Sequence, residues 1–379
     1  MSVLLCISAT RDDAARLTQD GPRRDFVELS RATGGETLYR ADRPRRRGLL
    51  GRLFGPHVRQ AWAAARRAHR GDTVFADGEH IGIPLCLFLM ARMRAGVRVV
   101  MLGHLVDRPW KRLPMAVLSR CGPASVLIVH SVTQEQRLRH TLGRRWRLES
   151  LPYQVDTAFW QANRTPDAAN PVLLAVGSEH RDYETLVEAV RGLPVHLKVA
   201  AGSHWARSTA GAASLPPNVE YIDRPLPFAE LRAAYESATA VVVPLEDVTN
   251  QSGVTSILEA MSMSRPVITT ANRGQRECIV GPVVRRAGSP ADVHDVVRGP
   301  VLFGRRQGAQ SGFYTPTGDS ESLRDAICLL LDDPALCRRL GEEGRTTACA
   351  SFELDRFIDA LARLITADTA SDRALAAAR

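Results

Sequence analysis

The chain has 379 residues, of which 45% are hydrophobic and 24% are charged, and its formal net charge is +9. Two domains are expected, because a single hydrophobic core rarely grows to this length, and the composition excludes a disordered or fibrous chain. The longest apolar run, residues 81–91, is too short to span a bilayer, and seven cysteines without CxxC or Cys/His pairing argue against a disulfide framework and a zinc site. The opening MSVLLCISATRDD predicts a first strand rather than a signal peptide, so we expect a cytoplasmic protein.

Positive charge is concentrated in the first part of the chain. Residues 1–150 hold 27 Arg and Lys against 13 Asp and Glu, whereas the remainder holds 23 against 28. The Arg-rich, Trp-containing segment 45–70 is amphipathic and could make a peripheral contact with the inner face of an anionic membrane. A coding preference for arginine explains the same charge, since only Lys111 and Lys198 accompany 48 arginines. Nucleic acid is not expected as a partner, because no motif supports it and aromatic residues are only 6% of the chain.

Short apolar strands alternate with helical patterns along the chain. In the first part, strands are predicted at residues 3–8, 73–75, 97–102 and 125–130, with helices at 58–69 and 110–120. A linker rich in Pro, Asn and Asp follows at residues 148–171. The second part predicts strands at residues 172–176, 197–201, 219–222, 240–244 and 266–269. Strands that are apolar on both faces belong to parallel sheets covered by helices on each side.

The fold class that follows is α/β, with two Rossmann-like, doubly wound parallel-sheet domains. We expect an N-terminal domain over residues 1–155 and a C-terminal domain over residues 156–345. Residues 346–379 predict a helical tail, with packing back on the N-terminal domain as one option.

Several common active-site motifs are absent. Neither GxGxxG nor the P-loop GxxxxGK[ST] occurs, which removes the usual grounds for dinucleotide binding and Walker-type NTPase chemistry. A DxD pair suited to a metal–diphosphate complex is missing, and so is the GxSxG elbow of serine hydrolases. We therefore expect neither a metal site nor a bound cofactor.

The segment NQSGVTSILEAMSMSRPVITT, residues 250–270, predicts a short helix followed by a buried strand. Ser252 can accept a hydrogen bond from a first-turn amide, and Gly253 removes a side chain that would keep a ligand from the backbone. The amides of Val254, Thr255 and Ser256 then point outward without intrahelical partners. With the positive end of the helix dipole, they form a site for phosphate.

Glu259 lies two turns into this predicted helix, among apolar residues. The preceding strand, 240–244, puts the helix N-terminus near the carboxyl edge of a parallel sheet, where open α/β sheets bind ligands. Glu259 would then accept hydrogen bonds from ligand hydroxyls. The alternative is a capped packing helix in which Glu259 pairs with Arg265, and the residues of this segment alone leave both readings open.

A second segment, VLLAVGSEHRDYETLVEA at residues 172–189, predicts a strand, a glycine turn, a basic residue and a helix. The guanidinium of Arg181 could reach a phosphate held by the other helix N-terminus, and its planar fork suits two oxygens at once. Taken by itself, an arginine at the position of Arg181 would more often be a solvated loop residue.

Further segments extend these two into a longer pattern: AVGSEHRDYETLVEAV, LKVAAGS, NVEYIDRPLPFAELRAAYESATAVVVPL, and SILEAMSMSRPVITT followed by RGQRE. In this order and spacing they resemble the donor-binding half of retaining GT-B glycosyltransferases, and above all glycosyltransferase family 4 (group 1). LPYQVDTAFW resembles the interdomain segment of that family, and SGFYTPTGDSESLRDAICLLLDDPALCRRLGEEGR resembles its C-terminal run. The resemblance covers roughly residues 120–365, and it implies two Rossmann-like domains that face a cleft, the first binding the acceptor and the second the donor.

The resemblance implies roles for residues in the donor-binding half. The E-x7-E motif of the family falls on Gln251 and Glu259: Glu259 would hold the nucleotide ribose, and Gln251 stands where the family has a carboxylate that contacts the donor sugar. Arg181 matches the basic residue that neutralises the donor diphosphate. Ser178 occupies a position that is usually Arg, so one phosphate-neutralising charge is lost.

Two more positions follow from the resemblance. The second glycine of the motif is displaced to Val254, with Gly253 one residue earlier, and the amides of Gly253, Val254 and Thr255 would bind the donor diphosphate. His104, in VVMLGHLV, matches a histidine that ends a strand of the first domain and faces the donor sugar. The alternative for His104 is a strand-end histidine hydrogen-bonded to backbone.

The function implied is retaining, metal-independent transfer of a sugar, of the hexosyltransferase type, from a nucleotide-diphosphate sugar to an acceptor hydroxyl. The expected catalytic residues are His104, Arg181 and Gln251. The acceptor would be a glycan, a lipid or a small molecule of secondary metabolism, and the sugar nucleotide would be a co-substrate rather than a cofactor. The competing hypothesis, motivated by Ser178 and Gln251, is a catalytically impaired GT-B scaffold that acts as a binding partner.

Overall fold

The computed structural model describes residues 2–41, 55–93, 96–106, 108–202, 215–248, 250–272, 274, 277–286, 301–302, 305–306 and 310–367. It divides the chain into two compact units: unit 1 comprises Met1–Pro152 and Asp355–Arg379, and unit 2 comprises Tyr153–Leu354. Residues 45–54 of the basic segment 45–70 lie outside the described residues. Among the described residues, none of the helices combines the length and the hydropathy needed to cross a membrane.

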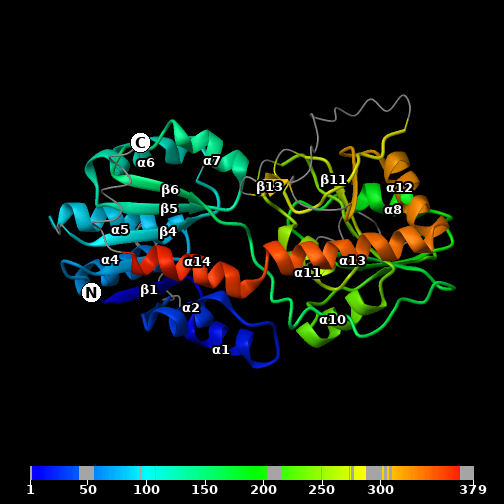
Figure 1. Cartoon of the computed structure of the whole chain (residues 1–379), viewed down its shortest axis with the longest axis horizontal. Helices are drawn as coiled ribbons and strands as arrows, with labels where there is room; N and C mark the ends of the chain where they lie inside the picture. Colours follow the sequence, from blue (N-terminus) through cyan, green and yellow to red (C-terminus); the bar gives the residue numbers. More distant parts are fainter. Residues whose placement is uncertain are drawn as a thin grey trace. The chain divides into compact units, whose positions relative to one another are not determined.

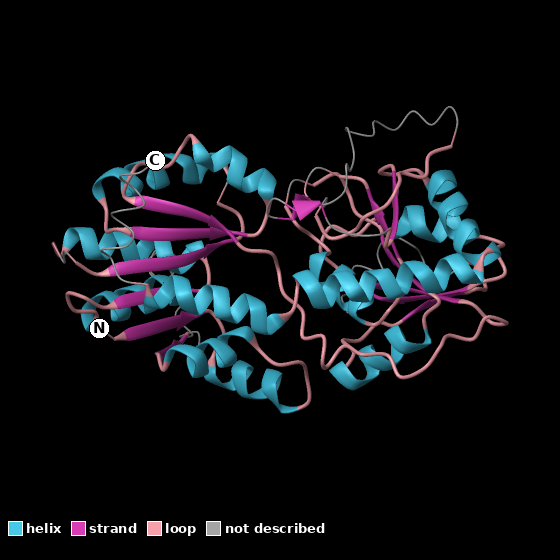
Figure 2. Cartoon of the chain, in the orientation of Figure 1, coloured by secondary structure: helices cyan, strands magenta, loops and turns pink. Residues whose placement is uncertain are grey.

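Unit 1 is built on a six-stranded parallel sheet in the order β2-β1-β3-β4-β5-β6 (Figure 1). Its strands are β1 Val3–Ile7, β2 Glu36–Tyr39, β3 Thr73–Ala76, β4 Arg98–Gly103, β5 Ser125–Val129 and β6 Trp146–Ser150. Its helices are α1 Arg11–Gln19, α2 Asp25–Thr33, α4 Pro56–Arg67, α5 Glu79–Ala91, α6 Pro109–Cys121 and α7 Val132–Arg139. Figure 2 shows that helices cover both faces of this sheet, as apolar central strands require.

The last helix of the described chain, α14 Leu354–Thr366, joins unit 1 from residue 355 onward. The buried guanidinium of Arg98, in β4, donates to the carbonyl oxygens of Leu364 and Ile365 at 2.6 and 3.3 Å. These carbonyls lie in the last turn of α14, where intrahelical donors are lacking and a cation is favoured. Arg23 also pairs with Asp355 at 2.7 Å, so contacts near both ends of α14 tie it to unit 1.

Unit 2 is built on a second six-stranded parallel sheet, in the order β14-β11-β10-β7-β8-β9. Its strands are β7 Val172–Val176, β8 His196–Ala200, β9 Val219–Tyr221, β10 Ala240–Val243, β11 Val267–Thr270 and β14 Gly312–Thr315. Its helices are α8 Tyr183–Val190, α10 Phe228–Ser237, α11 Val254–Ser262, α12 Ser320–Asp332 and α13 Pro334–Ser351. A short hairpin, β12 Val301–Leu302 and β13 Arg305–Arg306, accompanies the sheet.

The core of unit 2 lies on both faces of its sheet. Side chains alternate along the fully buried strand β10, with Val241 and Val243 packed in one apolar cluster and Ala240 and Val242 in another. Each face therefore needs a helical cover, and the sequence supplies amphipathic helices between the strands. The predicted α/β class, with two parallel sheets, is confirmed.

Candidate functional site

The sheet of unit 2 changes direction of winding between β7 and β10. From β7 the chain moves outward through β8 and β9, then returns to the other side of β7 with β10, β11 and β14. In open α/β sheets, ligands bind outside the carboxyl ends of the strands at such a switch point. The loop after β7 carries Arg181, and the segment after β10 leads to the N-terminus of α11, so both sequence-predicted features lie at this point.

Gly253 is the N-cap of α11 and adopts φ +83°, a left-handed conformation that favours glycine. A Cβ atom at this position would lie only 2.7 Å from Cγ1 of Val243, the last residue of β10. The glycine thus lets the backbone turn closely against the strand end before the helix begins. Sequence reasoning gave Ser252 a capping role, but the structure differs: the N-cap is Gly253, and no side chain caps this helix.

The first turn of α11 presents backbone amides, as the sequence predicts, although one of them has a partner. The amide of Val254 donates to the carbonyl oxygen of Gln251 at 3.3 Å, and the amide of Ile257 begins the helical pattern by donating to Gly253. Between them, the amides of Thr255 and Ser256 receive no acceptor from the described residues. These two donors, at the positive end of the helix dipole, are suited to an anion.

The guanidinium of Arg181 reaches the same helix end. Its Nη2 lies 3.4 Å from Oγ of Ser256, and its Nη1 would lie 3.6 Å from a Cβ atom placed on Gly253. Nε donates to the carbonyl oxygen of Val176 at 3.1 Å and Nη1 to that of Glu179 at 2.6 Å, which fixes the plane of the group. Burial lowers the pKa of Arg181, but an arginine remains charged at neutral pH. A fixed cation therefore lies beside the exposed amides of α11.

The loop that carries Arg181 is held in place by backbone and side-chain contacts. Gly177 adopts φ +96°, and a Cβ atom there would lie 2.6 Å from Nη2 of Arg181, so only glycine leaves room for the guanidinium. Arg181 forms an isolated bridge with Leu245, and the amide of Glu246 donates to the carbonyl oxygen of His180 at 3.1 Å. Sequence reasoning singled out Arg181 but not the role of Gly177.

Glu259 is buried on the inner face of α11 and has a partner in its own unit. One carboxylate oxygen accepts a hydrogen bond from the hydroxyl of Tyr235, in α10, at 2.9 Å. Burial and the nearby carboxylate raise the pKa of Tyr235 well above its usual value, so its hydroxyl stays a donor. Arg265, the alternative partner considered from the sequence, instead donates to the carbonyl oxygens of Tyr235, Glu236 and Arg164.

Gln251 and Ser178 occupy the two positions where the family pattern has charged residues. The Nε2 atom of Gln251 donates to a carboxylate oxygen of Glu277 at 3.1 Å. The carboxylate of Glu277 therefore lies directly beside the amide of Gln251. Ser178 is exposed on the loop after β7, next to Gly177. The sequence did not indicate this contact, because Glu277 lies 26 residues along the chain from Gln251.

His104 belongs to unit 1. It follows β4, and its amide donates to Glu79 Oε2 at 3.0 Å, at the start of α5. Lys111 donates to the other oxygen of Glu79 at 2.6 Å, and both side chains are nearly inaccessible to solvent. Burial would raise the pKa of Glu79, but the hydrogen bonds from Lys111 and His104 hold it below its usual value. A buried ion pair thus fixes the backbone at His104.

The ring of His104 is hydrogen-bonded and stacked. Nε2 lies 3.1 Å from the carbonyl oxygen of Asp77, and because a carbonyl oxygen can only accept, Nε2 donates in this bond. The ring stacks on His130, with centroids 5.5 Å apart. Burial and the neighbouring His104 lower the pKa of His130 to about 3, so that ring is neutral near pH 7. The backbone-bonded arrangement considered as the alternative for His104 is present.

Within unit 2, the structure thus brings Arg181, Gly253 and Thr255 to one helix end, while Glu259 is buried further along the same helix. The family model described as Glycosyl transferases group 1 matches residues 170–333, which include all of these residues. The Bacillus subtilis (strain 168) protein EpsD, whose name assigns it provisionally to the glycosyltransferases, is 32% identical over 112 residues. That match covers 30% of this chain and 22% of the length of EpsD.

Solved structures resemble the chain over almost its whole length. The sucrose-phosphate synthase of Thermosynechococcus elongatus matches with a TM-score of 0.67 and 18% identity, covering 100% of both chains. HepE of Anabaena, solved in complex with UDP and glucose, matches with a TM-score of 0.65 and 13% identity, covering 97% of this chain and 100% of the other. The trehalose-6-phosphate synthase OtsA matches with a TM-score of 0.61 and 10% identity, covering 97% of this chain and 99% of that one.

These likenesses, at identities under 20%, establish the fold. Two six-stranded parallel sheets with helices, together with the likeness to these solved structures, confirm the predicted GT-B fold. The match to the family model covers the sheet of unit 2 and the N-terminus of α11. Residues 170–333 match the group 1 glycosyltransferase model, in agreement with the resemblance found in the sequence.

Proposed function

We propose that this protein transfers a sugar from a nucleotide-diphosphate sugar to an acceptor hydroxyl, with retention of anomeric configuration and without a metal ion. The observation that carries the proposal is the position of Arg181 beside the first-turn amides of α11, which supports binding of a diphosphate. The structure of HepE holds UDP and glucose, and this chain shares its fold at 13% identity. That likeness supports a nucleotide sugar as the donor.

The chemistry needs stabilisation of charge on the leaving group. As the glycosidic bond breaks, negative charge collects on the departing diphosphate, and preorganised donors lower the barrier because they need not reorient. The fixed guanidinium of Arg181 and the amides of Thr255 and Ser256 supply such donors. Because these groups can neutralise the charge of the leaving diphosphate, no metal ion is needed for this purpose. Activity is therefore expected to survive a chelator. Attack of the acceptor on the same face as the departing diphosphate would give retention, which NMR of the product anomer tests.

Gln251 and Glu277 are proposed to orient hydroxyls of the donor sugar together. An amide and a carboxylate held at 3.1 Å offer both donors and acceptors, where the family pattern has a carboxylate at the first position. Gln251→Glu would place two carboxylates side by side, which is unfavourable for both charges. The exchanged pair, Gln251→Glu with Glu277→Gln, keeps one carboxylate and one amide. The preference of the enzyme among sugar nucleotides should therefore be lost in Gln251→Glu and regained in Gln251→Glu/Glu277→Gln.

The experiment that tests the transferase proposal uses thermal unfolding and turnover. Wild-type protein is heated with UDP, GDP, ADP and dTDP, because a ligand of the folded state raises the melting temperature by mass action. Donor hydrolysis or transfer is then measured with the matching sugar nucleotides for wild type and Arg181→Gln. Loss of one charge-stabilising donor typically lowers kcat by roughly 10²–10³. Stabilisation by no nucleotide, or equal turnover in the variant, would remove the proposal.

A scaffold without turnover is the second candidate, because Gln251 replaces a carboxylate of the family pattern. A scaffold would bind a nucleoside diphosphate but release no product from any sugar nucleotide. Arg181→Gln would then weaken binding and leave the cellular phenotype unchanged, whereas a transferase variant would lose it. The two measurements together separate the candidates.

A further inference from the structure

Large apolar side chains that are exposed to solvent gather on one part of unit 1. Of the eight such side chains in the described part of the chain, seven lie between residues 62 and 117, and only Leu329 lies in unit 2. Single exposed apolar residues are common and need no explanation, but a concentrated group marks an interaction surface. The seven belong to α4, to α5 with the turn after it, and to α6.

Helix α6 carries the most exposed of them in a single stripe. Trp110, Leu113 and Val117 expose 73%, 74% and 45% of their surface, and their spacing of three and four residues places them on one side of the helix. Met115 and Leu118, on the opposite side, are fully buried in the core of unit 1. The helix is thus apolar on two sides, although only one of them faces the protein.

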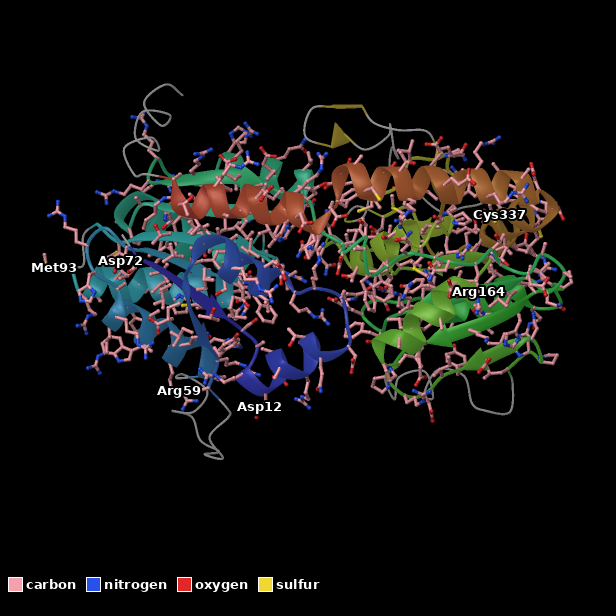
Figure 3. All side chains as sticks on the ribbon, turned by 60° about the horizontal axis from the view of Figure 1, so that its bottom comes forward. Asp12, Arg59, Asp72, Met93, Arg164 and Cys337 are labelled. Atoms are coloured by element: carbon pink, nitrogen blue, oxygen red, sulfur yellow. The ribbon has the colours of Figure 1, made fainter. Side chains whose placement is uncertain are left out.

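Helices α5 and α4 continue the surface. Leu87 and Met90 expose 43% and 38% on α5, and Met93, just after that helix, exposes 89% and lies at the margin of unit 1 in Figure 3. Trp62 of α4 is 39% exposed and packs edge-to-face on Phe88 of α5, with ring centroids 5.1 Å apart. Because α5 packs against both α4 and α6, the three helices form one apolar surface, called here the α4–α6 surface.

The charges of the α4–α6 surface are almost all positive. The three helices contain a single acidic residue, Glu79, which is buried against Lys111 and adds no negative charge to the surface. The exposed cations of this surface are arginines: Arg59, Arg66, Arg112 and Arg120, with Arg92 directly after α5, whereas Arg67 pairs with Glu36 of β2 at 2.9 Å. The guanidinium of Arg92 lies 5.2 Å from the ring centroid of Trp62, so cationic and aromatic groups interleave.

We propose that the α4–α6 surface docks on a membrane that contains anionic lipids. Trp110 and Leu113 would enter the interfacial region, where tryptophan is favoured, while the arginines would contact lipid headgroups from the rim. Charge decides between a membrane and a second copy of this chain. A two-fold dimer would bring this patch against itself and oppose arginine to arginine, whereas anionic headgroups complement it.

The proposal is independent of the proposed function, since it uses no residue of the helix end in unit 2. It extends the membrane contact expected for segment 45–70 to α5 and α6, and it assigns the insertion to Trp110 and Leu113. The sequence pattern did not single out either residue.

The test is sedimentation of the full-length protein with lipid vesicles. Vesicles of phosphatidylcholine alone are compared with vesicles of phosphatidylcholine and phosphatidylglycerol, at low and high salt. We expect binding to the anionic vesicles that weakens with salt. The variant Trp110→Ser/Leu113→Ser should bind the anionic vesicles roughly tenfold or more weakly, because it loses the inserted apolar area. Arg59→Gln/Arg112→Gln should lose a similar factor, with little further change at high salt.

Matched controls come from unit 2. Leu329→Ser removes an apolar side chain that is 45% exposed, as Val117 is, and Arg338→Gln/Arg339→Gln removes two exposed arginines. Both should bind vesicles as wild type does, and all variants should keep the wild-type melting temperature because the substituted side chains are exposed. Equal binding by wild type and Trp110→Ser/Leu113→Ser overturns the proposal. So does a wild-type dimer, seen by light scattering, that becomes monomeric in this variant without any vesicle binding.

Discussion

Gly177→Ala is expected to abolish most donor-dependent activity while leaving the protein folded. The added Cβ would lie 2.6 Å from Nη2 of Arg181, so the guanidinium must leave its position beside Ser256. The displaced group is the end of a flexible side chain, so it can move without displacing the backbone of the surrounding strands and helices. The functional loss should therefore exceed the stability loss.

The two effects can be separated with Gly192→Ala. Gly192 also has a positive φ, +72°, but a Cβ atom there would meet nothing within 4 Å. Placing alanine in a left-handed conformation costs about 1–2 kcal/mol at either site. For a unit of this size, each kcal/mol lowers the melting temperature by roughly 2–4 °C, so both variants should melt roughly 2–8 °C below wild type.

Only Gly177→Ala should also lose catalysis. Displacing one charge-stabilising group from the leaving diphosphate is expected to lower kcat by roughly 10²–10³, whereas Gly192→Ala should turn over as wild type does. The assay is transfer or hydrolysis of the sugar nucleotide that stabilises wild type, measured well below the melting temperature of both variants. Wild-type turnover in Gly177→Ala, at the same melting temperature as Gly192→Ala, would refute the role given to Arg181.

Three further outcomes are expected. Tyr235→Phe leaves a buried oxygen of Glu259 without its hydroxyl donor, and urea unfolding should show a loss of about 1–3 kcal/mol; an unchanged midpoint would contradict this contact. The pKa of His130 is about 3 in the folded protein and ~6.5 in the unfolded chain. The folded state is therefore most stable, as far as this residue is concerned, above pH ~6.5, where the ring is neutral in both states. It loses stability as the pH falls toward 3, because only the unfolded chain then binds the proton. The melting temperature of His130→Asn should accordingly fall less steeply than that of wild type over this range, and parallel curves would count against it. Lys111→Met leaves the Glu79 carboxylate buried and unpaired and should cost about 3–5 kcal/mol, largely recovered by adding Glu79→Gln; no recovery would show that the ion pair is not the cause.

The sequence predicts the elements that place the candidate site, because those elements are strongly apolar and because glycine follows β7 and precedes α11. The strands predicted at 172–176 and 240–244 match β7 and β10, and the helix and strand predicted for 250–270 match α11 and β11. Continuous apolar runs of this kind have few alternatives to a buried parallel strand. The part of the predicted helical tail that the structure describes, residues 346–367, is helical: it comprises the end of α13 and all of α14.

Edge strands and long-range contacts were missed for physical reasons. β2 and β6 lie at the two edges of the first sheet and are only partly buried, so their sequences lack a continuous apolar run. The partner of Glu259 is Tyr235, in the preceding helix, whereas sequence proximity pointed to Arg265. The sequence around a buried carboxylate does not indicate which side chain of another helix or strand will form a hydrogen bond with it. The positive φ of Gly177, likewise, follows from the loop's contacts rather than from its composition.

The backbone amide signals of α11 test most directly whether its N-terminus binds the donor diphosphate. The measurement is the amide chemical shift of Thr255 and Ser256 by NMR, on addition of the best-binding nucleoside diphosphate and of the matching nucleoside. Large shifts of these two amides are expected with the diphosphate and small ones with the nucleoside, and the large shifts should be lost in Arg181→Gln. Diphosphate binding that leaves both amides unmoved would contradict it.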